Sequence, residues 1–78
     1  MDSQELTDHL AAAGIDPARA GDYRHFKGGL YRVHGTLPDA TDDSTAVLYS
    51  NEQGRLFVRA ADNFFGLTPD GRPRFEAL

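Results

Sequence analysis

Residues 45–60 read T-A-V-L-Y-S-N-E-Q-G-R-L-F-V-R-A, and this stretch gives the clearest indication of the fold. Two runs rich in β-branched and aromatic residues flank the tetrapeptide Asn51–Gly54, a pattern typical of a β-hairpin. Glycine at the fourth position favours a type I turn followed by a left-handed glycine bulge, which pairs Tyr49 with Phe57. A two- or four-residue loop would shift the register by one residue and place Tyr49 opposite Leu56. We favour the bulged register because of the glycine.

The bulged register assigns the side chains of this hairpin to two faces, because successive residues of a strand point to opposite sides of a sheet. We expect one face to line the core with Leu48, Leu56, Val58 and Ala60. The other face then carries Tyr49, Phe57, Arg55 and Arg59. This second face has two interpretations. Either it packs beneath an N-terminal helix, with the arginines reaching out to solvent, or it is a ligand platform on which rings stack and arginines bind an anion. We favour packing, because small domains use their aromatic residues for packing first.

The rest of the chain divides into a helical segment, 1–20, and a small β domain, 21–78. In the first segment, apolar residues recur at helical spacing between a capping signal and a glycine. The apolar residues Leu6, Leu10 and Ala13 form a stripe on one side of the helix. Asp2 or Ser3 is the N-terminal cap, and Gly14 ends the helix. The second segment predicts short strands at 30–37, 45–50, 55–60 and 74–78, and a helical turn carrying Phe64 and Phe65. Four or five short strands favour a mainly β barrel or roll, since closure removes exposed strand edges.

Composition excludes several classes of protein. The chain has 78 residues, of which 40% are hydrophobic and 26% charged, as in one small globular domain. It has no cysteine, which excludes disulfides, thiolate metal sites and a cysteine nucleophile. No apolar run is long enough to span a membrane. The first ten residues hold no Lys or Arg, so we expect no secretory signal and a cytoplasmic protein.

The net charge of −4 is unevenly distributed. Residues 1–18 hold four acidic residues and no base, so the whole net charge lies on the helical segment. Residues 19–36 carry four bases against one acid. An acidic helix above a locally basic surface is therefore expected, and the overall charge does not exclude an anionic partner.

The stretch 23–29, Tyr-Arg-His-Phe-Lys-Gly-Gly, resembles the opening of the DUF1653 family, a set of short bacterial proteins without an assigned function. Later family motifs correspond in order to residues 48–50, 57–60, 64–65 and 74–76. The sequence departs from the family pattern at Ser50, Phe57 and Ala60, where the pattern has Gln, Trp and Pro. The resemblance implies a small SH3-like β-barrel, and it implies no catalytic chemistry.

Two groups of residues are candidates for a binding site. In the motif 23–29, basic side chains surround the glycine pair Gly28-Gly29, and the amides of a glycine turn can hold an anion or a peptide carboxylate. The structural alternative is a turn that leads into the first strand. The second group belongs to the aromatic and basic face of the hairpin. The candidate ligand-binding residues are Tyr23, Arg24, His25, Phe26, Lys27, Tyr49, Phe57 and Arg59.

We favour a non-catalytic binding module for an anionic ligand, a peptide or another protein. A barrel that binds single-stranded nucleic acid is the alternative, because such barrels combine stacking rings with basic grooves. An enzyme is the least favoured class. No serine lies in a nucleophile elbow, and the three histidines His9, His25 and His34 lack metal-ligand spacing. We therefore expect no catalytic residue, no metal, no cofactor and no membrane association, and we expect a monomer.

Overall fold

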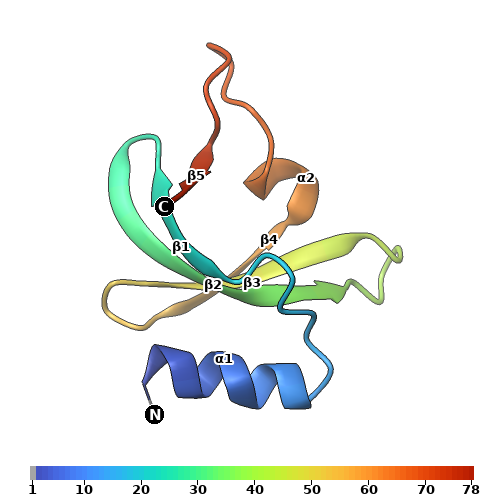
Figure 1. Ribbon diagram of the computed structural model, residues 1–78. Coiled ribbons are helices and arrows are strands. Elements are labelled where there is room, and N and C mark those ends of the chain that lie inside the picture. The colour runs from blue at the N-terminus through green and yellow to red at the C-terminus, as the bar shows by residue number, and fades with distance from the viewer. Residues whose placement is uncertain (1) are drawn as a thin grey trace.

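Helix α1 (Ser3–Ala12) lies against the convex side of a curled antiparallel sheet, whose concave side encloses the core (Figure 1). The computed structural model describes residues 2–78. The other elements are β1 (Gly21–His25), β2 (Gly28–Pro38), β3 (Thr45–Asn51), β4 (Leu56–Ala60), α2 (Ala61–Phe64) and β5 (Phe75–Ala77). The five strands follow the order β4-β3-β2-β1-β5. The predicted class, mainly β with four to five strands and an N-terminal helix, is confirmed.

The sheet is open, because β4 and β5 are its two edges in the described chain. Figure 1 shows α2 and the segment that follows it curving over the concave side, between these two edges. Backbone hydrogen bonds hold this segment in place, from Arg74 N–H to the Gly66 carbonyl (3.0 Å) and from Phe26 N–H to the Arg74 carbonyl (3.0 Å). The molecule is therefore a roll closed by a short helix and a loop.

The predicted register of the β3–β4 hairpin is confirmed. Tyr49 pairs with Phe57, and Asn51 N–H donates to the Arg55 carbonyl at 3.0 Å. Gly54 has φ +81°, as the glycine bulge requires. The Asn51 side chain also accepts the Arg55 N–H at 2.9 Å, which fixes the turn.

The predicted core face of this hairpin is wrong. The buried hydrophobic cluster is formed by Val33, Val47, Tyr49, Phe64 and Phe75. Leu56 and Val58, which we expected to line the core, are 49% and 65% exposed. Leu48 is half-buried and Ala60 is exposed. The sheet curls toward the aromatic face, and α1 contacts the convex side mainly at β2, so the far strand of that side stays open to solvent.

The sequence prediction also missed strand β1. Residues 21–25 pair with β2 on one side and with β5 on the other, so the motif 23–29 is itself a hairpin. Its turn is confined to Phe26 and Lys27. Polar residues alternate with Tyr23 and His25 in this strand. Because it contains no β-branched residue, its sequence does not indicate a strand.

Helix α1 begins and docks through polar contacts as well as apolar ones. The Asp2 carboxylate accepts the Glu5 N–H at 2.8 Å, as the capping signal predicts. The predicted stripe is only half-buried at Leu6 and Leu10, and Ala13 is exposed. Among the α1 side chains that the structure describes, Thr7 is the most buried, and its Oγ1 lies 2.8 Å from His34 Nδ1 on the convex side of β2. A docked polar pair therefore supplements a thin apolar stripe.

Candidate functional site

The eight predicted site residues lie in two different environments. Tyr23, Tyr49, Phe57 and Arg59 belong to the interior of the roll, and Arg24, His25, Phe26 and Lys27 lie at or beside the β1–β2 turn. The two groups meet at His25, whose ring contacts the core ring of Phe75 at a centroid distance of 4.8 Å.

The aromatic face of the β3–β4 hairpin is covered. Tyr49 is 4% exposed and stacks on Phe57 with centroids 5.6 Å apart. Tyr49 also packs edge-on against Phe64 of α2 and Phe75 of β5. The face is packed, but the expectation that the N-terminal helix covers it is wrong: α2 and β5 cover it, and α1 lies on the opposite side of the sheet. The rings are therefore not an exposed stacking platform.

Arg59 crosses the space between the two sheet edges. Its Nε donates to the Tyr49 hydroxyl at 3.1 Å, and its NH1 donates to Asn63 Oδ1 at 2.6 Å. The guanidinium carbon lies 5.3 Å from the centre of the Phe75 ring. These partners are neutral, so they orient the guanidinium without cancelling its charge.

His25 is the centre of a basic region. Its Nδ1 accepts the Lys27 N–H at 3.2 Å, so the proton of the neutral ring is on Nε2. Burial lowers the pKa of His25 below 6.5, and the nearby charges of Arg59, Lys27 and Arg74 lower it further. His25 is therefore neutral at pH 7, and three cations lie close enough to oppose its protonation.

The rim of this region carries more cationic side chains. Lys27 Nζ and the Arg72 guanidinium carbon lie 5.6 Å and 5.5 Å from the centre of the Phe26 ring. Among residues 2–78 the ion pairs are Arg32–Asp22 and Arg72–Asp70. The side chains of Arg24, Lys27, Arg59 and Arg74 thus have no carboxylate within 4.0 Å in the described chain. A groove of about 250 Å³ opens here, lined by Arg24, His25, Phe26, Arg72, Pro73 and Glu76.

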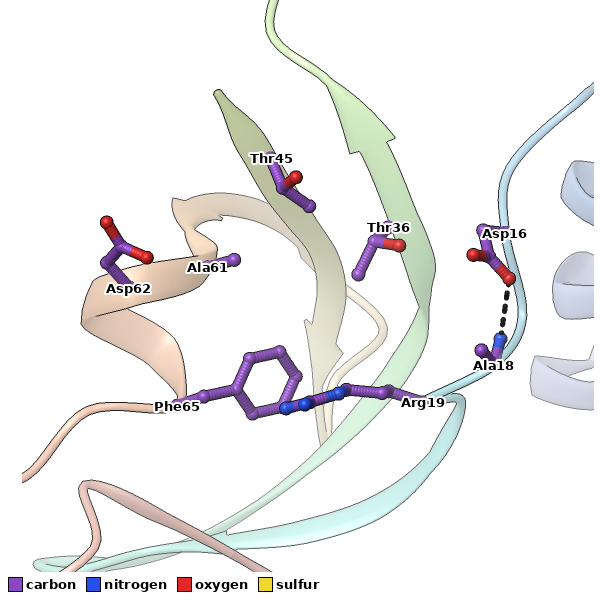
Figure 2. A pocket seen from close by; sticks show the side chains of 8 residues that line it. All are labelled: Asp16, Ala18, Arg19, Thr36, Thr45, Ala61, Asp62 and Phe65. Atoms are coloured by element: carbon purple, nitrogen blue, oxygen red, sulfur yellow. Dashed lines mark hydrogen bonds between the residues drawn. The ribbon is translucent and has the colours of Figure 1, made fainter. Parts of the chain in front are cut away.

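A larger pocket, of about 540 Å³, opens at the other end of the roll (Figure 2). It lies where β2 ends and β3 begins, whereas His25 lies where β1 ends and β2 begins. Its lining residues are Asp16, Ala18, Arg19, Thr36, Thr45, Ala61, Asp62 and Phe65. Sequence reasoning missed this pocket because its residues come from four separate segments and form no local motif. The only signal available was Arg19 beside a Pro-containing turn.

Among residues 2–78 no helix is long and apolar enough to cross a membrane. In the same range no group of three His, Cys, Asp or Glu side chains is placed to hold a metal ion.

Fold and motif together define a small antiparallel β-roll with a basic hairpin and a helix docked outside. The model of the family described as "Protein of unknown function (DUF1653)" matches residues 21–77, and the chain belongs to this family. The chain is similar to a DUF1653 protein from Bordetella bronchiseptica of known crystal structure, with 28% identity and a TM-score of 0.67. The similarity covers 77% of this chain and 86% of that protein. No curated protein matches the chain.

Proposed function

We propose that the protein is a non-catalytic, SH3-like binding module whose basic end binds a small anion or the carboxylate of an acidic peptide. The basic end is the region around His25 and the β1–β2 turn. The observation that carries this proposal is the group of cations around His25. The Lys27 N–H donates to His25 Nδ1, Arg59 and His25 both contact the Phe75 ring, and the charges of Lys27, Arg59 and Arg74 all lower the pKa of His25. Like charges gathered at one place raise the local potential, and an anion relieves that repulsion.

The charges around this end support an anionic ligand. The cations are Arg24, Lys27, Arg59, Arg72 and Arg74, and the carboxylates at the same end are Asp70 and Glu76. Asp70 is paired with Arg72 at 2.9 Å, which leaves Glu76 as the opposing charge. The His25 Nε2–H and the unused guanidinium N–H groups are suitable donors for carboxylate or phosphate oxygens.

The nucleic-acid alternative loses its main support in this structure. Binding of single strands relies on successive bases stacking on exposed rings. Tyr49 is buried, and Phe57 is half-buried with Arg55 lying over its ring at 5.4 Å. Phe26 is the ring at the basic end that a base could stack on, and Lys27 and Arg72 already lie against it.

The test is a sulfate titration followed by amide chemical shifts, since sulfate keeps its charge across the range where histidine titrates. Shifts should concentrate in residues 24–28 and 72–75. Both Lys27→Gln and Arg59→Gln should weaken binding by about tenfold, the loss of one charge-assisted hydrogen bond. Arg32→Gln is the matched control, because Arg32 lies on the convex side of the sheet, where it pairs with Asp22 and donates to Gln4 of α1, and its loss should leave the affinity unchanged.

The pH dependence gives a second readout at the same site. A bound anion favours the protonated form of His25, whose pKa is lowered in the free protein, so sulfate should bind more tightly as pH falls from about 8 to about 5. His25→Gln should abolish this dependence. Diffuse shifts, equal affinities in all variants, or tighter binding of a short oligonucleotide with shifts on other surfaces would overturn the proposal.

A further inference from the structure

The larger pocket is built by elements that come together only in the folded chain. Figure 2 shows the turn after Asp16 on one side, α2 with Asp62 on the other, and the ends of β2 and β3 with Thr36 and Thr45 between them. Asp16 is held to β2 by two main-chain hydrogen bonds with Thr36, each of 2.9 Å. One wall of the pocket is thus anchored to the sheet.

Arg19 is held in a defined position at this pocket. Its guanidinium carbon lies 4.2 Å from the centre of the Phe65 ring, a cation–π contact that holds the side chain against the ring. The Arg19 carbonyl accepts the Tyr23 hydroxyl at 3.0 Å, which fixes the backbone. Among residues 2–78 the ion pairs do not include Arg19. A planar guanidinium that is held by a cation–π contact and has no carboxylate partner can bind a carboxylate in a bidentate geometry.

Two carboxylates lie on opposite sides of the same pocket. Asp16 uses one oxygen to accept the Ala18 N–H at 3.0 Å, and Asp62 stands on the exposed side of α2. With Arg19, the charged side chains that line the pocket carry a net charge of −1. A plain anion would be repelled by the two aspartates, and a plain cation would meet the guanidinium. The charge pattern is complemented by a ligand that carries both signs.

We propose that this pocket binds a zwitterion, either a free α-amino acid or a short peptide. Its carboxylate pairs with Arg19, and its ammonium group pairs with Asp62 or Asp16. Thr36 and Thr45 line the same pocket, and a threonine hydroxyl is a neutral donor and acceptor for a ligand backbone. The pocket volume of about 540 Å³ lies within the range of small-molecule sites.

This site is separate from the basic end, because Thr36 and Thr45 lie at the opposite ends of their strands from the β1–β2 turn. The two proposals therefore produce shifts in different residues. Either one can fail without the other.

The experiment is a titration of alanyl-alanine into the full chain, followed by amide chemical shifts. Two blocked forms are titrated in parallel: N-acetyl-alanyl-alanine, which lacks the ammonium group, and alanyl-alanine amide, which lacks the carboxylate. The amides of Arg19, Thr36 and Thr45 should shift with alanyl-alanine. Each blocked form should bind at least about tenfold more weakly, since each loses a charge-assisted contact. Glycine is titrated alongside, and the tighter of the two zwitterions identifies a free amino acid or a peptide as the ligand.

Two variants assign the contacts. Arg19→Gln should remove the difference between alanyl-alanine and its amide, and Asp62→Asn should remove most of the difference between alanyl-alanine and its acetylated form. Arg55→Gln, far from the pocket, should preserve both differences. The proposal is overturned if neither zwitterion shifts the pocket amides at millimolar concentration, or if the blocked forms bind as tightly as the parent.

Discussion

Replacement of Gly35 by alanine should detach the linker between α1 and β1 from the sheet. Gly35 lies on the convex side of β2, at the place where the chain passes from Ile15 to Asp16. A Cβ atom at position 35 would contact the Ile15 side chain and would lie 2.5 Å from the Asp16 carbonyl oxygen. The backbone at Gly35 also has φ +152°, which L-residues rarely adopt. Backbone atoms cannot yield as a flexible side chain does, so the linker has to move.

The expected cost follows from the contacts that such a movement breaks. Asp16 and Thr36 exchange two main-chain hydrogen bonds of 2.9 Å, and each contributes about 1 kcal/mol. The unfavourable φ adds about 1 kcal/mol. Gly35→Ala should therefore lower the free energy of unfolding by about 3 kcal/mol, a large part of the total for a domain of this size.

Urea unfolding followed by far-UV circular dichroism measures this loss. Gly54→Ala is the matched control, because Gly54 also has a positive φ of +81° but nothing lies within 4 Å of an added Cβ. It should cost only about 1 kcal/mol, from backbone strain alone. Equal losses in the two variants would contradict this prediction, because the close approach of Asp16 to Gly35 would then have no energetic consequence.

Two further predictions concern the interior and the helix contact. Burial, and to a smaller extent the charge of Arg32, lowers the pKa of the fully buried His34, so the folded state binds its proton less well than the unfolded state. The contribution of His34 to the free energy of unfolding should therefore be greatest above about pH 6.5. It should fall as pH drops below that value, by up to about 1.4 kcal/mol per pH unit. His34→Gln should flatten this fall in urea midpoints measured across pH, and an unchanged slope would contradict the assignment. Phe64→Ala should cost about 3–5 kcal/mol, since Phe64 is fully buried and stacks on Phe75 at 4.0 Å. The apolar but 65% exposed Val58 should tolerate alanine within about 0.5 kcal/mol, and comparable losses at both positions would show that the core face is misassigned.

Local signals in the chain predicted the local structure well. The glycine of the β3–β4 turn predicted the register, and Asp2 predicted the start of α1. Both depend on backbone geometry within a few residues, which a short stretch of sequence specifies. The family motif at 23–29 likewise marked the basic hairpin, although its strand character was missed.

Local sequence signals do not show which face of the β3–β4 hairpin is buried. Tyr49 and Phe57 alternate with Leu56 and Val58, so both faces are apolar enough to form a core. Alternation shows which residues share a face, but the direction in which the sheet curls decides which face is inside. That direction depends on α2 and β5, which meet the hairpin only in the folded chain.

The same distinction separates the two candidate sites. The class of fold, the hairpin register and the cluster of bases at 23–27 follow from the sequence, because these features depend on neighbouring residues. Arg59 and Arg74 join that cluster, and Arg19 and Asp62 line one pocket, through the packing of the folded chain. Charges far apart in the chain act together only where packing brings them close, because electrostatic interaction depends on distance in space.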